Sequence, residues 1–412
     1  MFKRQYIINN MKVICIGAGA AGLFYSLNAS RRGAEVILLD SNFKAGKKLA
    51  ITGKGRCNIT NNKPVNEFIN HVVRNPKFLY SSLNQFTPQD TMEFFESHGC
   101  PLKVERGDRV FPQSDKAQSI INTLVNEAKK AGVIFKYNEK VISCYKDQNE
   151  FVVKTKDNVY KSDLLVIATG GKSYPLTGSL GDGYKFAKNF GHKIIDLKPA
   201  LCPIKIKERI HKEMIGFTLK NVEILAKTQY FSRKVFGDLE FLPGEITGPI
   251  TLTLSSLINR FDEVELVLDF KPALDNEKLS NRILREIEKT PNEDVKHLLS
   301  TLLPKEMREF FIENTNFDVD KKLNSFSKKE RLELIDSLKH FHLTFDGLED
   351  IEKAVVTSGG VDVNELNQKT LESKLVPGLY FIGEIIDVDA FTGGYSLQIA
   401  LSTAYAAACN IK

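Results

Sequence analysis

The chain has 412 residues, 42% of them hydrophobic and 26% charged, which is ordinary for a globular protein of two or three domains. Its net charge of +6 comes from 57 basic and 51 acidic residues spread along the chain, which fits an anionic ligand better than a nucleic-acid track. The six cysteines show no CxxC spacing and no His/Cys cluster, which disfavours a metal site or a disulfide scaffold and predicts a cytoplasmic protein. No apolar run is as long as the stretch of about 18 residues that indicates a membrane span. Residues 1–10 are expected to be a disordered extension.

The first predicted elements form a βαβ unit. "KVICIGAGAAG" is a short apolar strand that runs into a glycine turn, "LFYSLNASRRG" has helical character, and "AEVILLD" is a second buried strand. Residues 76–100 and 115–131 are predicted to be helical. Residues 133–169 are predicted to form short strands, with a β-meander attached to the main sheet and "DLLVIATGG" as another buried parallel strand.

The middle of the chain differs in character from its two ends. Residues 198–270 are rich in strands and interrupted by Pro and Gly, which predicts a β-barrel-like domain. Residues 275–340 are rich in Lys, Glu and Leu at helical spacing, which predicts a small helical subdomain. The apolar run "GLYFIGE" predicts another buried strand like those near the N-terminus, and "LQIALSTAYAAACN" predicts a helix of small residues.

The motif "GAGAAG" follows a strand, opens a helix and is followed by an acid at the end of the next strand, which is the context of a dinucleotide-binding turn. Gly17 permits the tight turn, and Gly19 lets the backbone approach a pyrophosphate at the helix N-terminus. Gly22 allows the helix and the strand to pack closely. The acid would bind the adenosine ribose and disfavours NADP, while FAD and NAD stay open at this point. The predicted contacts are Gly17, Gly19, Ala20, Ala21, Gly22, Asp40 and Ser41.

Three further features favour FAD. "VIATGG" is a buried strand that ends in a glycine turn, as in two-dinucleotide-fold flavoproteins. In "GLYFIGEIIDVDAFTGGYSLQ" an acid follows a strand, and a Gly-Gly pair precedes a helix whose N-terminal dipole would stabilise a reduced flavin. No second strand–GxGxxG–helix is present, since "GSLGDG" has the wrong glycine order. The contacts predicted here are Thr169, Gly170, Gly383, Glu384, Asp387, Gly393, Gly394, Tyr395 and Gln398.

From Met11 to about Ala408 the chain resembles a bacterial family of two-dinucleotide-fold flavoproteins, the BaiN-like or aminoacetone-oxidase-type FAD-binding enzymes. The resemblance is carried by "GAGAAG", "GKKLAITGKGRCNITN", "GDRVFPQSDKA", "IATGGKSYPLTGSLGDGY", "TGP", "VVTSGGV" and "GLYFIGEIIDVDAFTGGYSLQ". It implies a Rossmann-like α/β fold with an inserted β-barrel-like domain and a small helical subdomain. The expected boundaries are 11–197 and 351–412 for the FAD-binding domain, 198–274 and 341–350 for the barrel, and 275–340 for the helical subdomain.

The chain departs from the family pattern at a few positions. Leu242 and Pro243 stand where the pattern has Thr and His, so a proton-transfer role for that His is absent. Ala390, Ser396 and Ala404 replace Gly, Asn and Gly. These changes bear on pocket shape and proton handling more than on FAD binding.

The loop "GKKLAITGKGRCNIT" offers lysines and an arginine for a pyrophosphate, glycines for close approach, and polar donors for the flavin. A solvated basic surface loop is the alternative. Cys57 can be a redox nucleophile, a covalent flavin attachment or a small residue packed against the flavin. The third interpretation is favoured, because no resolving thiol stands nearby in the sequence. The contacts predicted in this loop and in the later strand "KVISCYK" are Lys48, Thr52, Gly53, Gly55, Arg56, Cys57, Asn58 and Val141.

These features predict an FAD-dependent oxidoreductase that acts on a small organic substrate, as an oxidase using O2 or as an NAD(P)H-linked reductase. The substrate is expected between the FAD domain and the inserted domain. Alternatives are an FAD-dependent RNA-modifying enzyme and a non-enzymatic flavin-binding redox module. No nucleic-acid or membrane partner is favoured, and the catalytic residues and the oligomeric state stay open. His297, His340 and His342 are expected to have surface or packing roles.

Overall fold

The computed structural model describes residues 11–411, so the predicted N-terminal extension lies outside the described residues. The chain divides into two compact units. Unit 1 consists of the residues up to 200 together with those from 351 onward, and unit 2 consists of residues 201–350. Each unit has its own hydrophobic core. Among residues 11–411, no helix combines the length and the apolar character that crossing a membrane requires.

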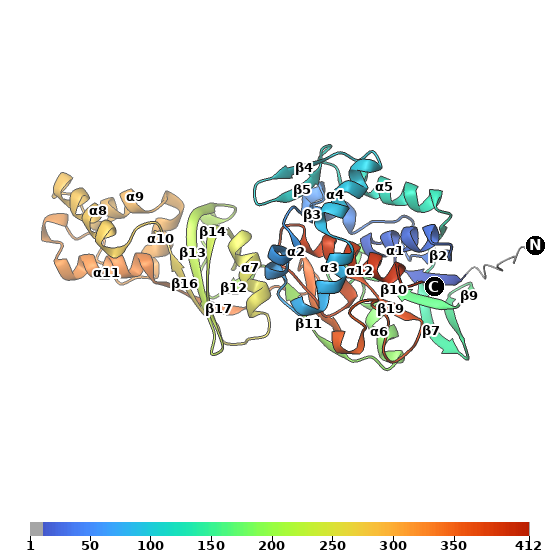
Figure 1. The fold of residues 1–412 in the computed structure, drawn as a ribbon. Coiled ribbons are helices and arrows are strands. Elements are labelled where there is room, and N and C mark those ends of the chain that lie inside the picture. Colours follow the sequence, from blue (N-terminus) through green and yellow to red (C-terminus); the bar gives the residue numbers. More distant parts are fainter. Residues whose placement is uncertain (1–10, 412) are drawn as a thin grey trace, which may run out of the picture. The chain divides into compact units, whose positions relative to one another are not determined.

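A five-stranded parallel sheet is the centre of unit 1 (Figure 1). Its strands, in spatial order, are β19 (Leu379–Phe381), β10 (Leu164–Ile167), β1 (Lys12–Ile16), β2 (Glu35–Leu39) and β6 (Ile134–Lys136). Every neighbouring pair is parallel, and β1 and β10 are almost entirely buried, as their continuous apolar sequences predict. Helix α1 (Ala20–Arg31) connects β1 to β2, which confirms the predicted Rossmann-like βαβ unit.

The remaining helices of unit 1 lie in the regions predicted to be helical or in connecting loops. They are α2 (Val65–Phe68), α3 (Tyr80–Gln85), α4 (Pro88–Ser97), α5 (Ala117–Lys130), α6 (Asp182–Asn189) and α12 (Tyr395–Ala408). Helix α4 begins with a capping box in which the Thr87 hydroxyl accepts the Asp90 N–H and the Asp90 carboxylate accepts the Thr87 N–H. Helix α12 packs against α1 and α3 and is buried along almost its whole length, in keeping with its small residues.

Three small sheets complete unit 1. Their strands are β3 (Thr60–Asn61), β4 (Leu102–Glu105) and β5 (Arg109–Pro112); β7 (Val141–Asp147), β8 (Glu150–Thr155) and β9 (Val159–Ser162); and β11 (Ile194–Ala200) and β18 (Val356–Val361). The predicted meander is therefore a separate antiparallel sheet of β7, β8 and β9. The strand just before this sheet, β6, belongs to the main sheet, because its backbone pairs with β2.

Unit 2 contains a closed six-stranded barrel and a group of helices (Figure 1). The barrel strands are β12 (Ile204–Ile206), β15 (Glu245–Thr247), β14 (Ser232–Leu242), β13 (Thr218–Lys227), β16 (Glu265–Asp269) and β17 (Phe341–Leu348). The helices that follow β16 are α8 (Asn276–Lys289), α9 (Val295–Leu302), α10 (Lys305–Glu313) and α11 (Lys328–Lys339). The predicted barrel and helical segment are confirmed.

Helix α7 (Pro249–Ile258) interrupts the strand-rich region and was not predicted. Its sequence "PITLTLSSLI" has the β-branched character of a strand. Pro249 at its first position favours a helix start, and Gly248 before it adopts φ +99. A Cβ at Gly248 would lie 2.9 Å from the Asp238 carbonyl oxygen, so packing of α7 on β14 decides the local structure.

Candidate cofactor site

Four predicted contact segments follow four adjacent parallel strands of unit 1. Gly17 follows β1, Asp40 follows β2, Thr169 follows β10 and Gly383 follows β19. Because the carboxyl ends of parallel strands meet at one edge of a sheet, these segments lie at the same edge. The chain order reverses beside β1, with β2 on one side and β10 on the other, and ligands of doubly wound sheets bind at such a switch point.

The three glycines of the first turn have different surroundings. A Cβ at Gly17 would lie 2.5 Å from the Ala168 carbonyl oxygen, and a Cβ at Gly22 would lie 1.8 Å from the Gly17 oxygen. A Cβ at Gly19 would meet no atom within 4 Å. Gly17 and Gly22 therefore build the turn, whereas Gly19 leaves open space just before Ala20 begins α1. The unsatisfied N–H groups and the dipole of a helix N-terminus favour an anion in such a place.

Asp40 lies beside this turn. Its Oδ2 accepts the Ala18 N–H at 2.6 Å, and its Oδ1 accepts the N–H two positions later at 2.7 Å. The Glu139 N–H donates to the Asp40 carbonyl oxygen at 2.9 Å, which brings the start of β7, and with it Val141, to the same side. Ser41 is exposed. The structure thus gathers the segments predicted to hold the adenosine half of a dinucleotide.

Lys48 connects two predicted segments from opposite ends of the chain. Its Nζ lies 2.7 Å from Glu384 Oε2 and 2.8 Å from Ser173 Oγ. The other Glu384 oxygen accepts the Thr357 N–H at 3.0 Å. A Cβ at Gly171 would lie 2.4 Å from Thr357 Oγ1, so only glycine lets this half-buried polar cluster close. Ser173 and Thr357 belong to two of the motifs that carry the family resemblance, but the sequence analysis did not predict them as site residues.

Arg56 lies on the other side of the same loop. Its guanidinium forms ion pairs with Glu105 and, at 2.5 Å, with Asp115. The same group stacks on the Phe111 ring at 4.2 Å from its centroid. Two carboxylates therefore balance its charge, and its predicted contact with a pyrophosphate stays a prediction.

The loop around Cys57 has an unusual backbone. Gly53, Gly55 and Cys57 itself adopt left-handed φ values of +56, +86 and +63. The Cys57 thiol is fully buried, which raises its pKa to about 12, and the thiol of Cys100 nearby adds to this rise. The hydrogen bond with Thr52 lowers the pKa by less. A thiol with so high a pKa is protonated at neutral pH, which supports the role of a small apolar residue.

The start of α12 packs directly on this loop. Gly394, which precedes Tyr395, adopts φ +96, and a Cβ there would lie 2.3 Å from the Thr60 carbonyl oxygen. Asn61 Nδ2 donates to the Gly393 carbonyl oxygen at 3.0 Å, across 332 positions of sequence. The two glycines therefore permit a close approach that brings the helix N-terminus to the loop.

Gln398, one turn into α12, is occupied by protein groups. Its Oε1 accepts hydrogen bonds from Thr60 Oγ1 at 2.6 Å and from Thr91 Oγ1 at 2.7 Å. Its Nε2 donates to the Phe86 carbonyl oxygen and to Ser402 Oγ. The side chain is 0% exposed, so it holds α12 against neighbouring segments, and its predicted contact with the cofactor stays a prediction.

Asp387 is also held by a protein partner that the sequence analysis missed. Its oxygens form two parallel hydrogen bonds with Arg74, at 2.7 and 2.8 Å, and one accepts Asn75 Nδ2 at 2.9 Å. The Asp387 side chain is only 4% exposed. Nearby, Gly383 adopts φ +74, and a Cβ there would lie 2.9 Å from Ala21 Cβ, so this segment packs against the start of α1.

His71 is another residue that the sequence analysis missed. Its ring stacks on the Tyr395 ring with centroids 4.5 Å apart, and burial raises the Tyr395 pKa. His71 Nδ1 lies 3.1 Å from the Glu67 carbonyl oxygen. A carbonyl oxygen only accepts, so Nδ1 is the donor in this contact. Nothing in the sequence around His71 indicates this position beside α12.

The residues at this edge fit an adenine dinucleotide that ends in a flavin. Asn58 Oδ1 and Thr169 Oγ1 are buried and have no hydrogen-bond partner within the described part of the chain. A Cβ at Gly394 would lie 2.9 Å from Asn58 Oδ1, and a Cβ at Gly183 would lie 2.1 Å from Thr169 Oγ1. Buried polar atoms are normally satisfied, so two such atoms in the predicted contact segments indicate that a polar ligand completes the site. Gly170, between the strand end and the polar cluster, adopts φ +72.

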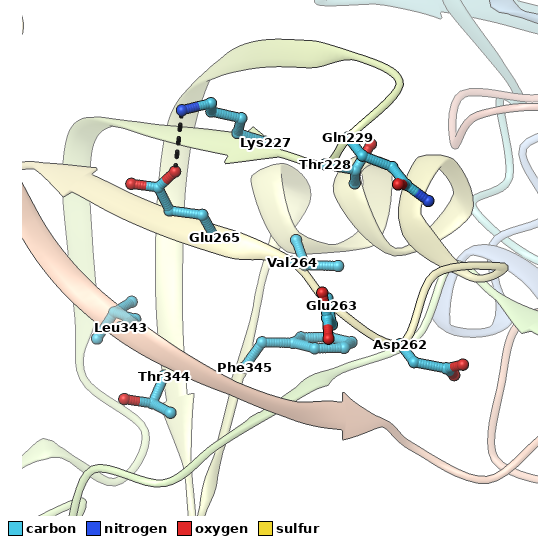
Figure 2. A pocket seen from close by; sticks show the side chains of 10 residues that line it. All are labelled: Lys227, Thr228, Gln229, Asp262, Glu263, Val264, Glu265, Leu343, Thr344 and Phe345. Carbon is cyan, nitrogen blue, oxygen red and sulfur yellow. Dashed lines mark ion pairs between the residues drawn. The ribbon is translucent and has the colours of Figure 1, made fainter.

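Unit 2 has a surface depression of different character at the barrel (Figure 2). Figure 2 marks one ion pair among the residues drawn, between Lys227 and Glu265 at 3.3 Å. Asp262 and Glu263 are exposed. Its lining is Lys227, Thr228, Gln229, Asp262, Glu263, Val264, Glu265, Leu343, Thr344 and Phe345. It contains no glycine turn and no helix N-terminus, so nothing in it resembles a dinucleotide site. Across residues 11–411, no three His, Cys, Asp or Glu side chains gather as a metal site would require.

The fold and the convergent segments define a Rossmann-type flavoprotein. The model of a family described as "HI0933-like protein Rossmann domain" matches residues 11–410. The chain belongs to this HI0933-like family of FAD-binding oxidoreductases, its cofactor is FAD, and the resemblance stated from the sequence motifs is confirmed.

Two relatives and one solved structure illustrate what the chain is similar to. The chain is 34% identical to the ribosomal RNA dihydrouridine synthase of Escherichia coli (strain K12), over 97% of each chain. It is 29% identical to the 3-dehydro-bile acid delta(4,6)-reductase of Clostridium scindens, over 95% of this chain and 97% of the relative. The crystal structure of 3-ketosteroid delta1-dehydrogenase from Sterolibacterium denitrificans is similar in fold, with a TM-score of 0.51 and 12% identity, over 97% of this chain and 99% of that one.

Proposed function

We propose that the protein is an FAD-dependent reductase that saturates a carbon–carbon double bond conjugated to a carbonyl group, and that its substrate is uracil in ribosomal RNA. The observation that carries this proposal is the 34% identity to a ribosomal RNA dihydrouridine synthase over 97% of both chains. The sequence analysis put a small organic substrate first and RNA second. We reverse that order here, because the name of the relative specifies both the RNA and the reduced base.

A small unsaturated ketone is the second candidate substrate. It is favoured by the 29% identity to a 3-dehydro-bile acid delta(4,6)-reductase. Both candidates share one chemistry, because uracil and a 3-oxo steroid with a neighbouring double bond each carry an alkene conjugated to a carbonyl. A hydride adds to the carbon distant from the carbonyl, and a proton adds to the carbon next to it.

FAD, when bound and reduced, supplies the hydride, and a reduced nicotinamide restores the electrons. Gly19 and the N-terminus of α1 would receive the pyrophosphate, and Asp40 would receive the ribose. Lys48, beside Glu384, would bind on the flavin side. The N-terminus of α12 carries a partial positive charge that stabilises negative charge nearby. A nicotinamide has no second GxGxxG domain here and would have to visit the substrate pocket.

His71 is our candidate for the residue that gives the proton to the substrate. Its Nδ1 is engaged with the Glu67 carbonyl oxygen, which leaves Nε2 free to hold a proton and pass it on. Its ring is fixed by stacking on Tyr395, the first residue of α12. No other histidine of unit 1 has this relation to the site, since His98 interacts with Glu127 and His192 is buried between Glu365 and Ser373.

The proposal is tested by separating the two halves of the reaction. The FAD-loaded protein is reduced anaerobically with NADH or NADPH, and then transcribed bacterial ribosomal RNA or a 3-oxo-4-ene steroid is added. The return of oxidised flavin absorption reports substrate reduction, and mass spectrometry of digested RNA reports dihydrouridine. Dihydrouridine formation supports the RNA substrate, and reoxidation by the steroid alone supports the second candidate. Reoxidation by O2 alone contradicts both and indicates an oxidase.

His71→Gln sharpens the same experiment. Reduction of the flavin by the nicotinamide should be unchanged, whereas reoxidation by the substrate should slow about 100-fold or more, as for loss of a general acid. His342→Gln is the matched control, because His342 is exposed on β17 of unit 2. Equal reoxidation rates in the two variants would exclude His71 as the proton donor.

A further inference from the structure

The β4–β5 hairpin, the segment that follows it and the loop before Cys57 carry four positive side chains without ion-pair partners in the described part of the chain. All four side chains are exposed, and none has an ion-pair partner within residues 11–411. We call them the loop–hairpin cations: Lys54, Arg106, Arg109 and Lys116.

The carboxylates of the same region are already neutralised. Glu105 and Asp115 pair with Arg56 and with Lys103, which lies 3.5 Å from the first and 2.6 Å from the second. Asp108 pairs with Lys63 at 3.4 Å. The loop–hairpin cations are therefore a local excess of positive charge, and they have no nearby carboxylate left to balance them.

The β4–β5 hairpin is joined to the loop that is proposed to contact the flavin. Strand β3 continues that loop and pairs with β5 in the same small sheet. A Cβ at Gly53 would lie 3.4 Å from the Phe111 ring, and the Arg56 guanidinium lies over the same ring at 4.2 Å from its centroid. A ligand on the loop–hairpin cations would therefore lie beside the proposed flavin loop.

Unit 2 carries a net negative charge, which favours unit 1 as the unit that binds an anionic polymer. Residues 201–350 contain 23 Lys and Arg against 27 Asp and Glu, so the basic surplus of the chain lies outside unit 2. The Lys-rich helices α8 to α11, which the sequence analysis considered for RNA, belong to that acidic unit. Most of their cations are interleaved with acids, as in Lys278–Asp275 and Lys289–Glu286.

We propose that the loop–hairpin cations form the surface that binds the phosphate backbone of the RNA substrate, next to the flavin. This inference rests on the proposed function. Phosphate contacts position an RNA and give binding its dependence on salt, whereas sequence is read elsewhere. Four separated cations beside a reactive centre suit a chain of phosphates better than one small anion.

The test compares two fourfold variants of the full-length FAD-loaded protein. One changes the loop–hairpin cations to Gln, as K54Q, R106Q, R109Q and K116Q. The other changes four exposed lysines of unit 2 that have no ion-pair partner within residues 11–411, as K212Q, K220Q, K322Q and K328Q. The affinity for transcribed bacterial ribosomal RNA is measured at several salt concentrations, and dihydrouridine is counted in parallel. Flavin content and reduction by dithionite verify that both variants are intact.

The loop–hairpin variant should keep its FAD and lose RNA affinity. Each lost phosphate contact lowers the slope of log K against log salt by about 0.7–0.9, so four contacts lower it by about 3. The unit 2 variant should match the wild type. If the loop–hairpin variant also matches the wild type, the surface is assigned wrongly while the proposed function stands. If the wild type neither binds the RNA nor forms dihydrouridine, the proposed function itself fails.

Discussion

The sharpest test of the cofactor site compares alanine at two glycines of the first turn. A Cβ at Gly22 would lie 1.8 Å from the Gly17 carbonyl oxygen, far inside van der Waals contact, so the backbone must shift. Overpacking of this kind costs about 1–3 kcal/mol. Gly22→Ala should therefore lower Tm by roughly 2–10 °C in a unit of this size.

Gly19→Ala should behave in the opposite way. Gly19 adopts φ −80, which alanine accepts, and its Cβ would meet no protein atom within 4 Å. Reduced freedom of the unfolded chain and a less favourable helix N-cap nearly cancel, so the stability without FAD should stay within about 1 kcal/mol. If the pyrophosphate approaches Gly19, the methyl group obstructs it, and the affinity for FAD should fall at least about tenfold, or about 1.4 kcal/mol.

The two effects are separated by measuring thermal unfolding of the FAD-free proteins and titrating FAD by quenching of its fluorescence. Gly19→Ala with wild-type affinity for FAD would refute the position assigned to the cofactor. Gly22→Ala with wild-type stability would refute the packing described for the turn.

Three further predictions concern single side chains. Cys57→Ser should keep FAD and most activity, and loss of turnover with FAD still bound would restore the redox-thiol interpretation. Arg74→Met should lower the free energy of unfolding, measured in urea, by about 3–5 kcal/mol, because it leaves the buried Asp387 carboxylate uncompensated. Lys161→Met is the control, because Lys161 pairs with Glu150 on the surface, and it should cost at most about 1 kcal/mol. Similar losses in the two variants would contradict the argument. Burial lowers the pKa of His192, so the unfolded chain takes up the proton first and stability should fall as pH drops through about 6.5. His192→Gln should flatten this fall between about pH 7 and about pH 5, and an unchanged pH profile would exclude the effect.

Local patterns predicted the central part of unit 1 well. The strand, glycine turn, helix and acid around "GAGAAG" form β1, α1 and β2, and the apolar runs before Thr169 and Gly383 form β10 and β19. These predictions were successful because buried parallel strands read as continuous apolar runs. Helix α7 was missed because its β-branched residues suggest a strand, and packing against β14 outweighs that weak preference. The pairing of β6 with β2 was not predicted, because strand partners lie far apart in sequence.

The sequence by itself determined the class of protein, the cofactor and the segments that meet at one edge of the parallel sheet. Only the tertiary structure decided how individual side chains are used: Arg56 and Gln398 are engaged by protein groups, Arg74 holds Asp387, and His71 stacks on Tyr395. The physical reason is the separation of the partners along the chain. A turn or a strand is specified by neighbours in sequence, whereas an ion pair or a stacked ring across some 300 positions leaves no local pattern and exists only once the sheet brings its ends together.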